Sequence, residues 1–528
     1  MALANRSQKS KGAFLRELQS LEANGDASRE EGIECAVALL RHSDDQVLVA
    51  ALKTLAAAGE DAGWYAGRCS QHLTSPSPTV RSAAARALAA FGAASADFSD
   101  QLIKMSEADQ EEVRASCIVA LGYIGVEGQA QRIAELVKDG SSVIAAAACQ
   151  ALGLLGPEGE VFADAIAARI ADAEVRYAAI AALAQLGPQA CEPHIQSILK
   201  LGLVDADAQT RQASSAAFSG LPSSVLEPLL PEVAELLRSQ QPELRCAAAL
   251  ALGFVGKAAQ GHVPELVALL QDGSEYAGEM HVQVGGGFRL PVTARKPKCA
   301  ALIALGMIGA ESEIPKIVKE LCDESYEVKL CALEALSSLP NAALAASNDV
   351  SFLLEDSHYY VRVKACQCLG VLAAEDAMSS LPELFEDKAP SVRVAALEAL
   401  ATCPSIAESF PAEVAKCLND PVPQVKAAAV TVLGCMGEMG KCYASLVASL
   451  LSDPDPRLQA AACEALGGMG EHGAAFAEEI ATCLHSSSHY EVQEAAGAAL
   501  KRLDEPVPAP PLSIYNLEGE GEGEGGAE

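Results

Sequence analysis

Aromatic side chains, basic charge and the common ligand-binding motifs are all scarce in this chain of 528 residues. Phe, Trp and Tyr together make up 4% of the sequence, with a single Trp, so the core cannot be built around large rings. Lys and Arg number 38 against 70 Asp and Glu, which gives a formal net charge of −32. A general nucleic-acid binder needs a basic face to displace counterions, so this balance argues against that class. The same charge would attract basic partners.

Membrane and catalytic signals are missing as well. No uncharged apolar run is long enough to span a bilayer, so we expect no membrane insertion. The sequence contains no CxxC pair, no GxxxxGK(S/T) phosphate loop and no histidine followed by glutamate. We therefore predict no catalytic residue, no cofactor and no metal site.

Cysteine is the exception to this scarcity, with seventeen residues in the chain. The odd number, and the placement of seven of the cysteines in predicted helices where sister segments carry alanine, indicate buried thiols in a reducing compartment. We expect a cytoplasmic protein. The first twelve residues lack the apolar core of a signal peptide but are mildly basic, so a short organelle-targeting peptide is an alternative.

One segment pattern recurs along almost the whole chain. EEVRASCIVALGYIG, at residues 111–125, has relatives such as PTVRSAAARALAAFG, PELRCAAALALGFVG and PSVRVAALEALATCP. The Val-equivalent residue, which we number as repeat position 0, occurs fourteen times at spacings of 31–35 residues, apart from one spacing of 53. Such regularity predicts a solenoid. Position 0 falls at residues 47, 80, 113, 144, 175, 210, 244, 297, 328, 361, 392, 425, 458 and 492.

Each unit is predicted to be a helical hairpin. Apolar residues at positions 0, 4, 8 and 11, such as Val113, Cys117, Leu121 and Ile124, share one face of the second helix. Alanines at positions 3 and 7 would let neighbouring helices approach closely. Turn aspartates before the second helix are expected to cap it, as at Asp323 and Asp420, and glycines after it suit a left-handed C-cap.

These (V/L)-(R/K)-x-A-A-x-x-A-L-G cores resemble the HEAT-repeat family, in particular the short HEAT-like repeats named after phycobilisome lyases. The resemblance covers roughly residues 30–503 and implies an all-α fold, an armadillo-like, right-handed α–α superhelical solenoid of about fourteen hairpins. It leaves enzyme alternatives open, because phycobilisome lyases attach bilins and deoxyhypusine hydroxylase, also similar, binds iron through His-Glu pairs. The preferred interpretation is a non-catalytic scaffold or adaptor for protein partners.

The two ends differ from the repeats. Residues 1–29 are predicted to hold a short tail and a capping helix, and residues 504–528 an acidic, Glu/Gly-rich tail that cannot pack a core. Within that tail, LSIYNL at residues 512–517 is either a docking motif or a segment that folds back on the last repeat.

A basic residue follows position 0 in most units, as in Arg114, Arg176 and Arg393. A row of phosphate or carboxylate receptors is one interpretation. We favour a structural ladder with the turn aspartates of neighbouring units, because acidic residues lie nearby in every case.

Positions 2, 6 and 9 are predicted to face away from the core, into the concave groove. Position 9 is often glycine, so positions 2 and 6 carry the side chains. The residues there run from basic through apolar to acidic, which suits a basic or amphipathic partner segment. The alternative is that tight curvature buries these side chains against one another. The partner-contact candidates are Val119, Tyr177, Leu250, Ile303, Leu330, Glu334, Glu398 and Glu464.

The long spacing contains an insertion at residues 272–293, with the sequence HVQVGGGFRLPV at 281–292. Alternating residues on either side of three glycines predict a β-hairpin. The hairpin is locally basic, so Phe288 and Arg289 join the partner-contact candidates, although a tolerated surface insertion is almost equally consistent with the pattern.

Overall fold

The computed structural model describes residues 30–126, 128–275, 281–282, 292–293, 296–487 and 489–503. The predicted capping segment at 1–29 and the tail at 504–528 lie outside these residues. The described chain divides after Ala310 into two compact units, which we call unit 1 and unit 2. Both units are α-helical solenoids, as the repeat pattern predicts.

A long helix begins within two residues of each of the fourteen repeat positions 0, in most cases two residues before it. Many of these helices have Pro at the first position, where a missing backbone N–H costs nothing. The long helices of unit 1 are α3 (Asp45–Ala58), α5 (Pro78–Ala90), α7 (Glu111–Ile124), α9 (Ser142–Leu154), α12 (Arg176–Leu186), α15 (Ala208–Ala216), α18 (Pro242–Val255) and α20 (Pro297–Ile308). Those of unit 2 are α22 (Tyr326–Ser337), α25 (Tyr359–Leu372), α27 (Pro390–Ala401), α30 (Pro423–Cys435), α33 (Pro456–Gly468) and α36 (Tyr490–Arg502).

In most hairpins the first helix is divided into short pieces, many of them next to segments of 3-10 helix. In unit 1 these pieces are α2 (Glu30–Leu39), α4 (Ala66–Ser70), α6 (Ser99–Met105), α8 (Ala130–Leu136), α10 (Pro157–Glu160), α11 (Ala163–Ala167), α13 (Pro188–Cys191), α14 (Ile195–Ser197), α16 (Ser223–Leu226), α17 (Leu230–Leu236) and α19 (Val263–Ala268). In unit 2 they are α21 (Ile314–Lys319), α23 (Pro340–Ala343), α24 (Ser347–Ser351), α26 (Glu375–Met378), α28 (Pro404–Ala407), α29 (Pro411–Lys416), α31 (Gly437–Lys441), α32 (Ala444–Ala448), α34 (Glu471–Ala474) and α35 (Ala477–Ser486).

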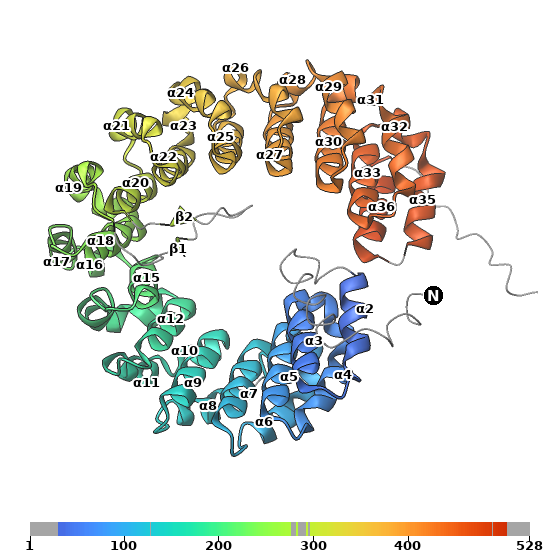
Figure 1. The fold of residues 1–528 in the computed structure, drawn as a ribbon. Coiled ribbons are helices and arrows are strands. Elements are labelled where there is room, and N and C mark those ends of the chain that lie inside the picture. The colour runs from blue at the N-terminus through green and yellow to red at the C-terminus, as the bar shows by residue number, and fades with distance from the viewer. Residues whose placement is uncertain are drawn as a thin grey trace, which may run out of the picture. The chain divides into compact units, whose positions relative to one another are not determined.

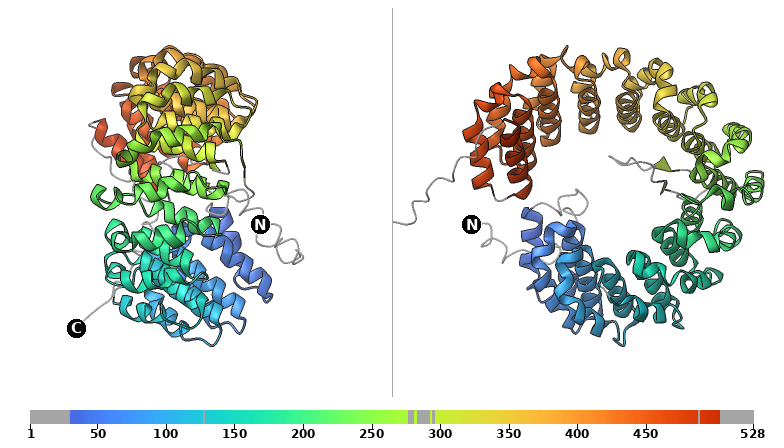
Figure 2. Two further views of the ribbon diagram at one scale, coloured as in Figure 1. Left: turned by 90° about the vertical axis from the view of Figure 1, so that its left-hand side faces the viewer. Right: turned by 180° about the vertical axis from the view of Figure 1, so that it is seen from behind.

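Each unit therefore has two layers. Within a unit, the long helices lie side by side on the inner side of the curve and the short helices cover their outer side (Figure 1). Figure 2 shows the same two layers from behind. The core lies between the layers and uses the predicted stripe, since Val113, Cys117 and Leu121 have exposed fractions of 0%, 0% and 3%. No helix in the described ranges has the length and apolar content needed to cross a membrane.

Consecutive long helices touch through a repeated contact between glycine and alanine. A Cβ added to Gly122 would lie 2.6 Å from Cα of Ala151, and one added to Gly467 would lie 2.7 Å from Cα of Ala499. Each glycine occupies repeat position 9, and each alanine occupies position 7 of the next helical repeat. The same contact occurs at Gly153, Gly253, Gly370 and Gly434. Position 9 thus lies against the neighbouring helix, whereas the sequence placed it on the groove side.

Glycines at repeat position 12 end the long helices, as predicted. Gly125, which follows α7, has φ 70° and ψ 43°, a left-handed conformation in which a Cβ would be crowded. Gly309 adopts the same conformation after α20. Ala373 holds this position after α25 with φ 49°, the one non-glycine residue with positive φ among the residues described. The helix stop is thus determined by position, even where the residue is not glycine.

Part of the insertion is described. Strands β1 (His281–Val282) and β2 (Val292–Thr293) pair antiparallel, with His281 opposite Thr293. They lie on the inner side of unit 1 (Figure 1). The longer alternating strands of the predicted hairpin, with Phe288 and Arg289, fall outside the described residues and stay a prediction.

Replacing Gly467 with Ala should lower the free energy of unfolding by about 1–3 kcal/mol, because the new methyl group would force α33 and α36 apart. Gly497 provides the matched control in α36, since its added Cβ would meet only Cδ1 of Leu484 at 3.7 Å. There the higher helix propensity of Ala should raise stability by up to about 1 kcal/mol. Urea unfolding followed by circular dichroism measures both changes. Equal effects of the two substitutions would contradict the steric account.

Candidate partner-binding surfaces

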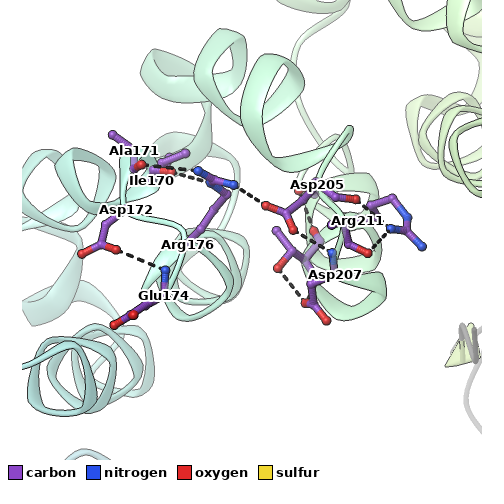
Figure 3. Close-up of polar contacts among 11 residues, drawn as sticks. Ile170, Ala171, Asp172, Glu174, Arg176, Asp205, Asp207 and Arg211 are labelled. Carbon is purple, nitrogen blue, oxygen red and sulfur yellow. Dashed lines mark hydrogen bonds and ion pairs between the residues drawn. The ribbon is translucent and has the colours of Figure 1, made fainter.

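The edge of the solenoid formed by the intra-unit turns carries an aspartate–arginine ladder (Figure 3). Arg176 begins α12, and its guanidinium donates hydrogen bonds to the carbonyls of Ile170 and Ala171 in its own turn, at 2.7 and 3.3 Å. The same guanidinium pairs with the carboxylate of Asp205 in the next helical repeat. Asp205 also accepts a hydrogen bond from the backbone N–H of Asp207, at 2.7 Å. Asp205 therefore orders its own turn and links this turn to the previous helical repeat.

This arrangement recurs in both units. Arg393 binds the carbonyl of Asp387 in its own turn at 2.8 Å and the carboxylate of Asp420 in the next at 2.7 Å. The further pairs are Arg114–Asp139, Arg245–Asp272, Lys329–Asp356, Arg362–Asp387 and Lys426–Asp453. The predicted ladder is confirmed. These cations are already paired, so they do not form a row of open phosphate receptors.

The turn aspartates have a different local role from the predicted one. Asp323 and Asp420 come two residues before Ser325 and Val422, the residues that precede α22 and α30. Their carboxylates accept hydrogen bonds from the backbone N–H groups of Ser325 and Val422, both at 2.8 Å. They fold the turn and do not cap the second helix, because the helix begins too far along the chain for a side-chain cap.

The ladder changes the ionisation of its aspartates. Burial alone would raise the pKa of Asp387, but hydrogen bonds from Arg362 and from the N–H of Ala389, with the charges of Arg362 and Arg393, lower it overall. Asp272 and Asp356 follow the same balance, each with burial opposed by its ladder cation and a backbone N–H, and the pKa of both is lowered. The folded state thus favours the ionised carboxylates.

The inner faces of the long helices are the second surface to consider. Of the predicted contact residues, Tyr177 is 45% exposed, Val119 is half-buried, and Glu398 and Glu464 are exposed. Glu334 lies on the same face of α22, but it forms an ion pair with Lys364 of α25. These five residues remain accessible to different degrees, and Glu334 already has a cation.

The prediction that the middle of the groove presents apolar side chains to a partner is wrong. Leu250, Ile303 and Leu330 have exposed fractions of 1%, 1% and 3%, so no partner can reach them. Leu330 occupies repeat position 2, on the same flank of the helix as position 9, which packs against the neighbouring helix. Leu250 and Ile303 occupy position 6, which is buried in α18 and α20 although it is exposed in α27, α30 and α33.

The sequence interpretation also missed repeat position 10. At about 100° per residue, a helical wheel centred on positions 0, 4, 8 and 11 places positions 2, 6 and 9 nearest the opposite direction and position 10 about 65° from it. Position 10 carries Tyr123, 50% exposed, and Val371, 54% exposed. The helical wheel alone does not find these residues, because packing between neighbouring helices decides which of these positions stays exposed.

In unit 2, positions 6 and 10 form an exposed strip along four neighbouring long helices, α25, α27, α30 and α33, which we call the inner strip. Its members are Val371, Glu398, Thr431, Cys435 and Glu464, which are exposed, and Gln367, which is half-buried. Among the described residues, no basic side chain lies within ion-pair distance of Glu398 or Glu464. The Glu398 side chain is exposed, yet the surrounding protein removes enough water to raise its pKa. A bound cation would relieve that desolvation.

Histidine, cysteine and carboxylate side chains do not converge in the ranges that the structure covers, where no group of three or more could hold a metal ion. His485 lies in α35 and His489 directly before α36, so the two do not share a helix face.

The HEAT repeats profile matches residues 68–153, 99–183, 350–434 and 411–501, which together make up half of the chain. No curated protein matches. Among solved structures, importin beta is similar, with a TM-score of 0.50 and 14% identity over 89% of this chain and 72% of its own. Kap95 in a Kap95:Nup1 complex has a TM-score of 0.55 and 14% identity over 90% of this chain and 72% of that one. At such identity, these similarities establish the solenoid fold alone.

Replacing Asp387 with Asn should lower the free energy of unfolding at pH 7 by about 1.5–3 kcal/mol, because Arg362 loses its charged acceptor. A lowered pKa in the folded state means that the stabilisation is present above the ordinary value of 3.8 and is lost as the pH falls below it. The wild type should therefore lose more stability than the Asp387→Asn variant between about pH 5 and pH 3. Urea titrations across this range measure the difference.

Asp376, an exposed residue of α26, provides the control. Asp376→Asn should follow the wild-type pH dependence. Parallel acid curves for Asp387→Asn and the wild type would show that the ladder carboxylate has no special role.

Proposed function

Because the chain belongs to the HEAT-repeat family, we propose that it is a non-catalytic scaffold or adaptor that binds segments of partner proteins. The observation that carries this proposal is the inner strip of unit 2, an exposed row on consecutive helices. A row of this kind fits an extended or helical segment that passes across several units. Neither enzyme alternative is supported by a specific observation in the described part of the chain.

The composition of the inner strip favours a basic, amphipathic partner. Val371 and Cys435 offer apolar contact, while Glu398 and Glu464 offer carboxylates with no basic neighbour. Lysine or arginine side chains of a partner would supply the missing positive charge, and the negative charge of the whole chain would speed their approach. The structurally similar Kap95 is found with Nup1 in its complex, which is consistent with partner binding by a solenoid of this type.

The double charge reversal Glu398→Lys with Glu464→Lys tests the proposal. We expect the bound partners to fall at least about tenfold in affinity purification with quantitative mass spectrometry, since two favourable contacts become repulsive. The melting temperature should change little, because both side chains are exposed.

The matched control is Glu383→Lys with Glu479→Lys, which makes the same charge change on the short-helix layer. Glu383 lies in the 3-10 segment η15 (Leu381–Glu386) and Glu479 in α35, and both are exposed. Retention of all partners by the inner-strip variant, or an equal loss in the control, would reject the inner strip as the binding surface.

We also propose that the protein works in a reducing, cytoplasmic compartment. All seventeen cysteines are free thiols, and fourteen of them are buried. Burial raises the pKa of Cys69, Cys117 and Cys149 to about 12, which keeps these thiols protonated and unreactive. If cells are treated with an alkylating agent before and after denaturation, every cysteine should be recovered as a thiol. Disulfide-linked peptides would contradict the proposal.

A further inference from the structure

Four rings stack at the turn edge of unit 2, outside the inner strip. The Tyr326 and His358 rings lie parallel with centroids 4.1 Å apart, and His358 is 5.7 Å from Tyr359 and 5.5 Å from Tyr360. The Tyr359 and Tyr360 centroids are 4.1 Å apart. We call Tyr326, His358, Tyr359 and Tyr360 the ring stack. The ring stack joins two consecutive helical repeats of unit 2, because Tyr326 begins α22 and Tyr359 begins α25.

The ring stack is a local departure from the repeat. Tyr326 and Tyr359 both occupy repeat position −2, where most units carry Pro, Ala, Ser or an acidic residue. Their exposed fractions are 41% and 38%, although aromatic rings are rare in this chain and the core does not need them here. Large exposed rings in contact with one another are typical of recognition surfaces.

The charges around the ring stack are mainly negative. The two turns that carry it, with the first turns of α22 and α25, contain the carboxylates Asp323, Glu324, Glu327, Glu355 and Asp356, and the cations Lys329 and Arg362. Lys329 is paired with Asp356 and Arg362 with Asp387, so both cations are already neutralised. Glu324 and Glu355 are exposed, and they precede Tyr326 and Tyr359 by two and four residues in the chain. The surface thus combines aromatic faces with excess negative charge.

We propose that the ring stack is a docking site for an arginine-containing segment of a partner protein. A planar guanidinium stacks on a tyrosine face and binds carboxylates at the same time, which matches both features of this surface. Lysine would gain the charge attraction without the planar stacking. An acidic segment would be repelled by the carboxylates.

This site is separate from the inner strip and does not rest on the function proposed for it. The ring stack lies at the turns that precede α22 and α25, whereas the inner strip begins at Gln367, further along α25 and on its inner face. Either surface could bind its segment without the other.

The test uses the full chain and a fluorescent peptide of alternating glycine and arginine, with binding measured by fluorescence anisotropy at 0.15 M and 0.5 M salt. Tyr326→Ala with Tyr359→Ala should weaken binding about tenfold at both salt concentrations, because the stacking contribution is not screened as ion pairs are. Tyr326→Phe with Tyr359→Phe should bind within about threefold of the wild type, since the ring faces remain. The Glu324→Gln with Glu355→Gln variant keeps every ring and should weaken binding mainly at 0.15 M salt.

Tyr490→Ala is the matched control, because Tyr490 also occupies repeat position −2, is 74% exposed and lies outside the ring stack. It should bind as the wild type does. Equal weakening by Tyr490→Ala, unchanged binding by the double alanine variant, or equal affinity for a glycine–lysine peptide would overturn the proposal. Tighter binding of a proline-rich peptide would also overturn it, in favour of a polyproline-binding surface. Thermal melts of every variant confirm that the comparison is made between folded proteins.

Discussion

The close approach of consecutive long helices, glycine against alanine, is the constraint on which each unit of this solenoid depends. A single helical hairpin of this composition cannot bury its own apolar face, so each one needs its neighbours. Small residues at repeat positions 9 and 7 let the backbones approach, and this leaves space in the core for Leu, Val and Cys but little for rings. The scarcity of aromatic residues is thus a requirement of the packing, and the few rings are left for other uses.

Much of the fold could be predicted from the sequence, because the repeat converts one local pattern into fourteen observations of it. The helical hairpins, the core stripe, the glycine stops and the ladder all depend on short-range spacing, which the sequence states directly. The burial of Leu250, Ile303 and Leu330 could not be predicted in the same way. It depends on how far each helix turns toward its neighbour, which is a tertiary property. At Leu330, in position 2, the error amounts to less than a quarter turn of the helix. Leu250 and Ile303 stand at position 6, which is buried in α18 and α20 but exposed in α27, α30 and α33.

The candidate surfaces arise where the repeat relaxes its own rules. The inner strip keeps carboxylates for which the described part of the chain supplies no ion-pair partner, whereas the ladder pairs turn aspartates such as Asp205, Asp387 and Asp420. The ring stack places tyrosine at repeat position −2 in two consecutive repeats, where most repeats carry Pro, Ala, Ser or an acidic residue. The core requires neither feature, and we therefore assign both to recognition.

The last two described repeats of unit 2 lack the basic residue of the ladder. In the last two described units, Gln459 and Gln493 replace the basic residue and donate to the carbonyls of Asp453 and Ser487, at 2.8 and 2.7 Å. The amide keeps the bond to its own turn but carries no charge to share with a further unit. Added salt therefore acts unevenly along unit 2. It screens the charged ladder pairs in the interior of unit 2, whereas the contact between the last two hairpins has no ladder ion pair for salt to screen.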